Sequence, residues 1–236
     1  MRGLSVSSLV ILLAGSLAGQ GLTLNGRVEL VRGKAPATGD QSKVVVWLTP
    51  LTGTPPSTPA PAEHIQLVQK GKTFEPHLLV IPVGTAVDFP NRDPFFHNVF
   101  SLFAGKRFDL GLYEAGSTRK VHFDRPGVSY IFCNIHPEMS AVVVALNTTH
   151  YAISDKGGNI SIADVPPGRY QLHVWSELAS PEALQGMTRE ITVAEGANSL
   201  GTIRLVETEL ATRGHKNKYG RDYDPNASGP AYNPPR

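Results

Sequence analysis

The chain has 236 residues and a formal net charge of +2, with 41% hydrophobic and 18% charged residues. This length is enough for one large or two small domains with a buried core. The balanced charge excludes a dedicated nucleic-acid-binding protein, which would show a strongly basic face. The sequence contains one cysteine, so an internal disulfide bond is impossible.

The first segment has the features of an export signal. Arg2 supplies a positive start, and an uncharged, largely apolar stretch leads to Ser16 and Ala18, the small residues that a signal peptidase reads. The stretch is too short for a membrane span, which needs ~20 apolar residues. We therefore expect residues 1–18 to be a cleaved signal peptide, and the mature protein to be periplasmic or secreted, without a membrane span.

Residues 22–62 are expected to form N-terminal strands and a proline-rich linker. Two runs rich in β-branched residues, at 28–31 and 44–48, predict strands. The stretch 52–62 is dense in proline and threonine, a composition that favours an extended linker or a surface loop.

The stretch 63–147 has the pattern of a β-sandwich. Short runs rich in valine, isoleucine and phenylalanine, bounded by turn-forming residues, predict strands at 65–68, 78–81, 86–89, 99–103, 118–123, 128–132 and 141–146. Strands at this spacing favour a sandwich or barrel of Greek-key type. We expect an all-β protein with a Greek-key sandwich here and a second, smaller β-sandwich after it.

The second β unit is predicted over 148–206. Turn sequences at 155–159 and 165–168 separate short apolar runs, and a short helix is predicted at 181–187. The unit spans about 60 residues, near the lower limit for independent folding. The sequence therefore leaves open whether the N-terminal strands within 22–51 pair with it.

Residues 207–236 are expected to be a flexible tail. From Arg213 onward the tail has almost no aliphatic residues and contains four prolines and three tyrosines, a composition typical of segments without a packed core. Removing the chain after Thr212 is therefore expected to leave the spectrum of a metal site elsewhere in the protein unchanged.

Four residues with sulfur or imidazole side chains form the candidate site. Cys133, His136 and Met139 follow one another at a spacing of three residues between two predicted strands, and His97 comes just before another strand. Two histidines, one cysteine and a weak axial methionine are the ligands of a type 1 (blue) copper site. Zinc is the main competitor, but structural zinc sites rarely use methionine. The sequence therefore predicts one mononuclear copper site.

The stretch 65–146 resembles a cupredoxin of the plastocyanin and amicyanin type. The residues that carry the resemblance are Phe74-Glu75-Pro76, Val83-Gly84-Thr85, Val87-Asp88-Phe89-Pro90-Asn91, His97-Asn98-Val99, Phe123-Asp124-Arg125-Pro126-Gly127 and the loop from Cys133 to Met139, whose short spacing is that of amicyanin. The resemblance implies that copper is bound by His97, Cys133, His136 and Met139.

The same resemblance implies roles for residues around the ligands. Asn98 would tie the two ligand loops together, and the ring edge of His136 would reach an apolar surface where electrons leave. The candidates for this surface are Pro94, Phe95, Phe96 and Pro137.

Residues 149–206 are similar to carboxypeptidase regulatory-like, transthyretin-like sandwiches. The similarity rests on the segments 154–160 (SDKGGNI) and 164–170 (DVPPGRY). Domains of this kind usually begin with strands like those at 26–28 and 44–48. The cupredoxin stretch is therefore either inserted into this sandwich or placed before it.

The other histidines and several carboxylates are expected to have no metal role. Turns and strand ends, where carboxylates usually cap or are solvated, hold Asp88, Asp93, Asp109, Glu114 and Asp124. The histidines expected at the surface or on strands are His64, His77, His122, His150, His173 and His215.

Together these features predict an exported copper protein that carries single electrons between redox partner proteins. The sequence has no nucleophile motif, phosphate-binding loop or paired-carboxylate signature, so we expect no enzymatic activity. Two other functions stay open. One is copper binding and delivery without redox cycling, and the other is an envelope scaffold or adhesion module in which the cupredoxin part is a spacer.

Overall fold

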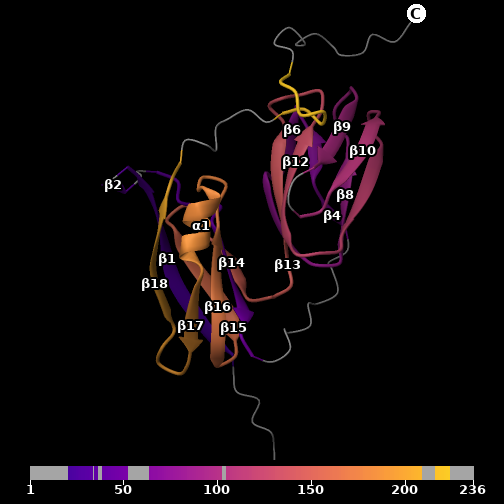
Figure 1. Ribbon diagram of the computed structural model, residues 1–236. Coiled ribbons are helices and arrows are strands. Elements are labelled where there is room, and N and C mark those ends of the chain that lie inside the picture. Colours follow the sequence, from indigo (N-terminus) through magenta and orange to yellow (C-terminus); the bar gives the residue numbers. More distant parts are fainter. Residues whose placement is uncertain are drawn as a thin grey trace, which may run out of the picture.

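The computed structural model describes residues 21–33, 35–36, 39–52, 64–102, 105–208 and 216–223. The predicted signal peptide and most of the proline-rich stretch lie outside these residues. In the described part, the regular structure is β-strand apart from the short helix α1 (Pro181–Met187), which confirms the all-β fold class. No helix in these ranges is long and apolar enough to cross a membrane. Figure 1 shows the strands gathered in two bodies.

The first body, which we call the site sandwich, is built from the strands between residues 65 and 146. These strands are β4 (Ile65–Gln66), β5 (Val68–Lys70), β6 (Thr73–Glu75), β7 (Leu78–Pro82), β8 (Thr85–Pro90), β9 (His97–Ser101), β10 (Phe108–Tyr113), β11 (Thr118–Phe123), β12 (Gly127–Cys133) and β13 (Ser140–Leu146). One sheet has the order β10-β9-β12-β13-β7 and another has the order β11-β8-β4, while β5 and β6 pair as a hairpin.

Alternating side chains of these strands meet in one apolar core. In β8 the side chains of Thr85, Val87 and Phe89 are buried, whereas Ala86 and Asp88 are only partly buried. This is the period of two expected for a strand with one covered face. The core cluster that holds Val87 and Phe89 also contains the candidate ligands Cys133 and Met139. The site is therefore built onto the end of a packed core.

The sequence prediction omits β10. Its sequence, FDLGLY, contains Gly111, whose φ of +67° lies in the left-handed region that favours glycine. The pairing of β10 with β9 shifts register between Asp109 and Leu112, as in a β-bulge. Within this irregularity the Gly111 N–H donates to the Asp109 carboxylate at 2.9 Å. The bulge obscures the strand's alternation and positions Asp109, which takes part in the site described below.

The second sandwich contains strands from both ends of the chain. These are β1 (Leu22–Arg32), β2 (Ala35–Pro36), β3 (Val45–Pro50), β14 (Tyr151–Ile153), β15 (Asn159–Val165), β16 (Gly168–Trp175), β17 (Arg189–Val193) and β18 (Ser199–Val206). Strand β1 pairs antiparallel with β15 and parallel with β18, and β3 lies between β14 and β16. The site sandwich is thus inserted in the chain between β3 and β14.

A third apolar cluster joins the two sandwiches. It contains Val142, Val144 and Leu146 of β13 together with Val45 of β3 and Trp175 of β16. The alternate residues of β13 belong to the core of the site sandwich, so this strand is buried on both faces. A continuous apolar run such as AVVVAL is typical of strands that are covered on both sides.

His77 and Glu177 form an ion pair across the contact between the two sandwiches. His77 Nε2 lies 2.6 Å from a Glu177 carboxylate oxygen, and Nδ1 lies 3.1 Å from the Ser140 carbonyl oxygen. Since both neighbours are acceptors, the imidazolium form satisfies both of them. The hydrogen bond to Glu177 is the main reason that the pKa of His77 is raised, against the opposing effects of burial and of the Lys43 charge.

Glu177→Gln is expected to weaken this contact mainly at low pH. A raised His77 pKa stabilises the folded protein fully below the unfolded-state value of about 6.5, and this stabilisation is lost as the pH rises through the folded-state value. Because the two side chains are 35% and 33% exposed, we expect an effect of ~0.5 kcal/mol. Urea unfolding near pH 5.5 and near pH 8.5 checks this. The prediction would be contradicted if Glu177→Gln lowered the free energy of unfolding by the same amount at both pH values.

Candidate metal centre

The strand pairing brings the two ligand-bearing segments together. His97 is the first residue of β9, and Cys133 is the last residue of β12. These strands are antiparallel neighbours, with Cys133 opposite Val99, so the end of β12 lies beside the start of β9. His136 and Met139 follow in the loop before β13. The strand pairing therefore places His97 at the same end of the site sandwich as Cys133.

Three candidate ligand atoms form a nearly equilateral triangle. Cys133 Sγ is 3.6 Å from His97 Nδ1 and 3.5 Å from His136 Nδ1, and the two Nδ1 atoms are 3.2 Å apart. A point equidistant from the three atoms lies about 2.0 Å from each, close to the metal–nitrogen and metal–sulfur distances of protein sites. This group can therefore hold a metal ion.

The sulfur of Cys133 combines burial with backbone hydrogen-bond donors. The residue is fully buried, and burial is the main reason that the pKa of its thiol is raised. The N–H groups of Asn98, Ile135 and His136 act in the opposite direction, because their hydrogen bonds stabilise the thiolate. A metal ion inside the triangle would supply the positive charge that holds this thiolate in a buried position.

The loop from Cys133 to Met139 is closed by backbone hydrogen bonds. The Met139 N–H donates to the His136 carbonyl at 3.1 Å, and the Cys133 N–H donates to the Met139 carbonyl at 3.3 Å. The Met139 side chain is fully buried in the same core cluster as Cys133. The loop thus carries its three predicted ligands on one short closed turn, with Met139 held in the core.

Asn98 joins the two ligand segments through its backbone. Its carbonyl accepts the Asn134 N–H at 2.9 Å, and its N–H donates to the Cys133 sulfur. Its side-chain Nδ2 donates instead to Asp109 Oδ1 at 2.7 Å. The tie between the two loops that the cupredoxin resemblance implies is therefore made by the main chain, and the side chain connects it to β10.

Asp93, which the sequence analysis assigned to a turn without a metal role, is a buried site residue. Its carboxylate lies 2.9 Å from His97 Nε2 and accepts the N–H groups of Gly71 and Lys72 at 2.6 and 3.0 Å. Since a carboxylate only accepts hydrogen bonds, the imidazole proton lies on Nε2, and the Nδ1 lone pair is available to a metal. The available signal in the sequence is a carboxylate four residues before a predicted histidine ligand.

The electrostatics of the site favour neutral imidazoles. Burial is the main reason that the pKa values of both His97 and His136 are lowered. For His97 the Asp93 carboxylate acts in the opposite direction, whereas for His136 the neighbouring His97 lowers the pKa further. Neutral imidazole is the form that binds metal ions, so burial prepares both side chains for this role.

One side of the site reaches the surface through aromatic contacts. The Phe95 ring lies 5.3 Å from the His97 ring and 5.4 Å from the His136 ring, measured between centroids. His136 is half-buried, whereas His97 is fully buried. The predicted electron-exit residues are all at least partly exposed: Pro94, Phe95, Phe96 and Pro137.

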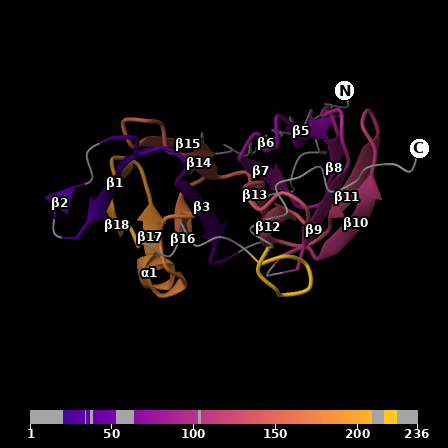
Figure 2. The same ribbon diagram turned by 90° about the horizontal axis from the view of Figure 1, so that it is seen from above.

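Part of the C-terminal tail has a defined position. Residues 216–223 are hydrogen-bonded to the site sandwich, whereas 209–215 and 224–236 lie outside the described residues. Figures 1 and 2 show the segment in yellow at the end of the sandwich where β12 ends. Contacts with residues 80 to 110 positions away in the sequence therefore hold 216–223 against the site sandwich.

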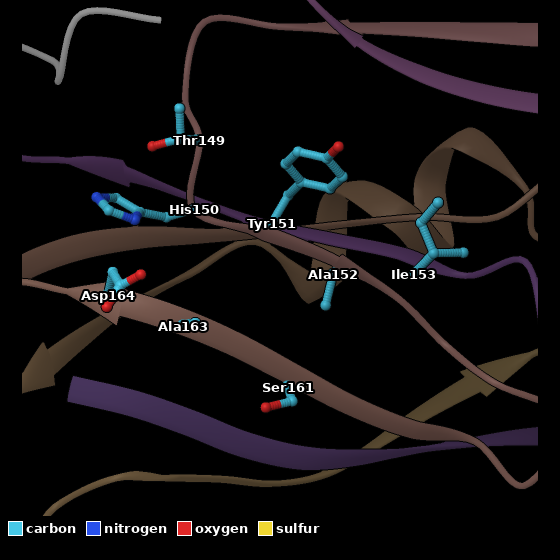
Figure 3. Close-up of a pocket in the computed structure, with 8 residues that line it drawn as sticks. All are labelled: Thr149, His150, Tyr151, Ala152, Ile153, Ser161, Ala163 and Asp164. Atoms are coloured by element: carbon cyan, nitrogen blue, oxygen red, sulfur yellow. The ribbon is translucent and has the colours of Figure 1, made fainter. Parts of the chain in front are cut away.

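A groove in the second sandwich contains none of the predicted site residues. It runs along β14 and β15, and its lining side chains are drawn in Figure 3: Thr149, His150, Tyr151, Ala152, Ile153, Ser161, Ala163 and Asp164. Among the described His, Cys, Asp and Glu side chains, the group that could hold a metal ion is the triangle of His97, Cys133 and His136. The candidate metal site of the described residues therefore lies at the end of the site sandwich.

The chain is similar in structure to several copper proteins. No protein-family model and no curated protein matches it. A purple cupredoxin from Nitrosopumilus maritimus is 26% identical, and the match covers 35% of this chain and 99% of that chain with a TM-score of 0.32. A reduced Cu(I) form of an amicyanin variant is 20% identical, and the match covers 42% of this chain and 98% of that chain with a TM-score of 0.34.

A copper-containing nitrite reductase from Thermus scotoductus SA-01 is also similar. It is 21% identical, and the match covers 50% of this chain and 28% of that chain with a TM-score of 0.35. The expectation of no enzymatic activity is therefore wrong as an exclusion, because one of the similar structures is an enzyme. The resemblance of 149–206 to carboxypeptidase regulatory-like domains stays a prediction.

Proposed function

We propose that this chain binds one copper ion through His97, Cys133 and His136, with Met139 as a weak fourth ligand, and that it carries single electrons between redox partner proteins. The observation that supports this most directly is the triangle of one sulfur and two nitrogen atoms, with sides of 3.2 to 3.6 Å. The Met139 thioether, buried in the same core cluster as Cys133, would complete the donor set of a type 1 copper site.

The donor set fits copper better than zinc. Structural zinc sites are four-coordinate and use cysteine, histidine or carboxylate ligands. Within the described ranges, the group that could hold a metal contains two histidines and one cysteine. Among the residues that the structure describes, no further cysteine, histidine, aspartate or glutamate belongs to this group as a fourth ligand. The nearby Asp93 carboxylate is engaged by His97 Nε2 and by two backbone N–H groups. A thioether from Met139 suits the softer copper ion.

When bound, copper supplies a one-electron couple between Cu(II) and Cu(I). The role of the chain is to hold the ligands in one geometry that suits both charges. Asp93 orients His97, the N–H groups around Cys133 stabilise its thiolate, and the closed loop fixes His136 and Met139. Ligands fixed in this way reduce the rearrangement that accompanies each change of charge.

We also propose that electrons pass through the partly exposed edge of His136. Phe95 packs against this ring at 5.4 Å between centroids, and Pro94 and Pro137 are exposed. An apolar, partly exposed surface of this kind is suited to brief contact with another protein. The partners would be exported redox proteins, since the charged start and apolar stretch of 1–18 favour export.

The visible and paramagnetic-resonance spectra of the mature protein with added Cu(II) test the proposal. We expect an intense thiolate-to-copper band that bleaches with ascorbate and returns on oxidation. Cys133→Ala should lose the band while its circular dichroism spectrum stays that of a β protein. A band of equal intensity in Cys133→Ala would contradict the ligand assignment. A copper complex that binds tightly but does not cycle would favour copper delivery instead.

A further inference from the structure

The segment from Lys216 to Tyr223, which we call the C-terminal strap, reaches the backbone of a candidate ligand. The Tyr223 hydroxyl donates a hydrogen bond to the Cys133 carbonyl oxygen at 2.8 Å. Tyr223 is half-buried, although it belongs to an otherwise mostly exposed segment. The contact joins two residues that are 90 positions apart in the sequence.

Lys218 of the strap contacts Asn134, which follows Cys133, and Asp109, which contacts Asn98. Its backbone N–H donates to Asn134 Oδ1 at 2.9 Å, and its Nζ lies 2.8 Å from Asp109 Oδ2. The other oxygen of Asp109 accepts the Asn98 side chain, and Asn98 donates its backbone N–H to the Cys133 sulfur. One strap residue therefore braces the position after Cys133 and, through Asp109, the position after His97.

The strap has internal structure that prepares it for these contacts. Asn217 Oδ1 accepts the N–H groups of Tyr219 and Arg221, both at 3.0 Å, and the Gly220 N–H donates to the Asn217 carbonyl at 2.9 Å. Gly220 has a φ of +73°, in the region that favours glycine. A turn organised by its own asparagine loses less conformational freedom when it docks.

Hydrogen bonds and one ion pair connect the docked strap to the site sandwich. None of its residues belongs to the three apolar core clusters. Segments with few buried apolar contacts open more readily than the core of a protein. We therefore expect the strap to undock more readily than either sandwich unfolds, so that its docking can adjust the site.

We propose that the C-terminal strap is a positioning element of the metal site, in which Tyr223 and Lys218 hold the Cys133 and Asn98 segments in place and thereby tune the reduction potential. This inference rests on the proposed copper function. Reduction lowers the positive charge of the site, so the nearby Lys218 ammonium group and the Tyr223 hydroxyl hydrogen, which points at the Cys133 carbonyl, both favour the reduced form. The hydroxyl hydrogen bond withdraws electron density from the Cys133 segment, so its loss is expected to lower the potential.

The first experiment measures access to Cys133 in the metal-free protein. Cys133 is the one cysteine of the chain, so a thiol-specific reagent reports on this site alone. Tyr223→Phe is expected to label roughly fivefold faster, because one hydrogen bond that holds the Cys133 segment is removed. Removing the residues after Thr208 should accelerate labelling at least as much. Tyr219→Phe is the matched control, since this strap tyrosine is 71% exposed, and it should label at the rate of the unsubstituted protein.

The second experiment measures the midpoint potential and the thiolate-to-copper band of the copper-loaded protein. Tyr223→Phe and the truncated chain are expected to show a lower potential and a shifted band, whereas Tyr219→Phe should change neither. This replaces the unchanged spectrum that the sequence alone predicted for removal of the tail, because the strap contacts the Cys133 segment. A merely structural contact would change stability and leave both readouts in place. Unchanged labelling, potential and band in Tyr223→Phe and in the truncated chain would overturn the proposal.

Failure of the copper function can be told apart from failure of the strap proposal. If the unsubstituted protein shows no thiolate-to-copper band, the proposed function fails, and the labelling rates alone decide about the strap. Faster labelling in Tyr223→Phe and in the truncated chain then still supports a positioning role at Cys133. Labelling at the unsubstituted rate overturns that role.

Discussion

Asp93→Asn is expected to lower the affinity of the site for copper by about 10- to 100-fold, the usual effect of losing the outer partner of a histidine ligand. One Asp93 oxygen accepts the Gly71 N–H, and the other accepts the Lys72 N–H and pairs with His97 Nε2. An amide has one oxygen, so in either orientation its NH₂ group faces at least one backbone donor. If the NH₂ group also faces His97, Nε2 must accept a hydrogen bond from it, and the imidazole proton moves to Nδ1. Nδ1 is the atom that would bind the metal, so its lone pair is then no longer available.

The same substitution is expected to destabilise the metal-free protein by about 1–3 kcal/mol, because a buried donor loses its acceptor. Hydrogen bonds from Lys72, His97 and Gly71 hold the pKa of Asp93 below its ordinary value although burial acts to raise it, so the charged form is the one that the fold uses. Copper titration and urea unfolding measure the two effects.

Asp124→Asn is the matched control for this prediction. The Asp124 side chain is 57% exposed and pairs with Lys106 at the surface. Removing its charge is expected to change stability by less than about 0.5 kcal/mol and to leave copper affinity unchanged. Copper affinity in Asp93→Asn equal to that of Asp124→Asn would mean that the carboxylate does not orient His97.

Trp175→Ala is expected to cost about 3–5 kcal/mol of unfolding free energy, the usual range for removing a buried tryptophan. Trp175 is 6% exposed and packs with Val45, Val142, Val144 and Leu146 in the cluster between the two sandwiches. Its loss leaves a cavity at the surface that couples them. We therefore also expect the two sandwiches of the variant to unfold in separate transitions. Circular dichroism would report on both sandwiches, and the thiolate-to-copper band would report on the site sandwich alone.

Leu112→Ala provides the control for this loss of apolar volume. Leu112 lies in β10 and is 52% exposed, so its truncation is expected to cost less than about 0.5 kcal/mol. If Trp175→Ala were no more destabilising than Leu112→Ala, the cluster between the sandwiches would not contribute to the stability of the folded chain.

The features that the sequence predicted well depend on neighbouring residues. The strand 118–123 and the helix 181–187 have the bounds that were expected, because alternation and the Ser180 cap are local signals. The spacing of Cys133, His136 and Met139 is also local, since the loop from residue 133 to residue 139 holds them on one turn. Local pattern was therefore enough to name these three side chains as candidates.

The features that the sequence analysis missed depend on residues that are distant in the chain or on irregular backbone. Strand β10 was missed because Gly111 and the shift in register interrupt its alternation. The role of Asp93 depends on its burial beside the β5–β6 hairpin, where Gly71 and Lys72 donate to it. Neither feature has a periodic signal that a scan along the chain detects.

The sequence by itself determined the all-β class and the four candidate ligands of this protein, because side-chain alternation and loop spacing are properties of short stretches. Only the tertiary structure decided that β1 pairs with β15 and β18, that His97 meets Cys133 and His136 in a triangle, and that Tyr223 reaches the Cys133 carbonyl. Each of these contacts closes a long loop of chain, and such pairings are selected by the packing of the whole fold and not by local preference.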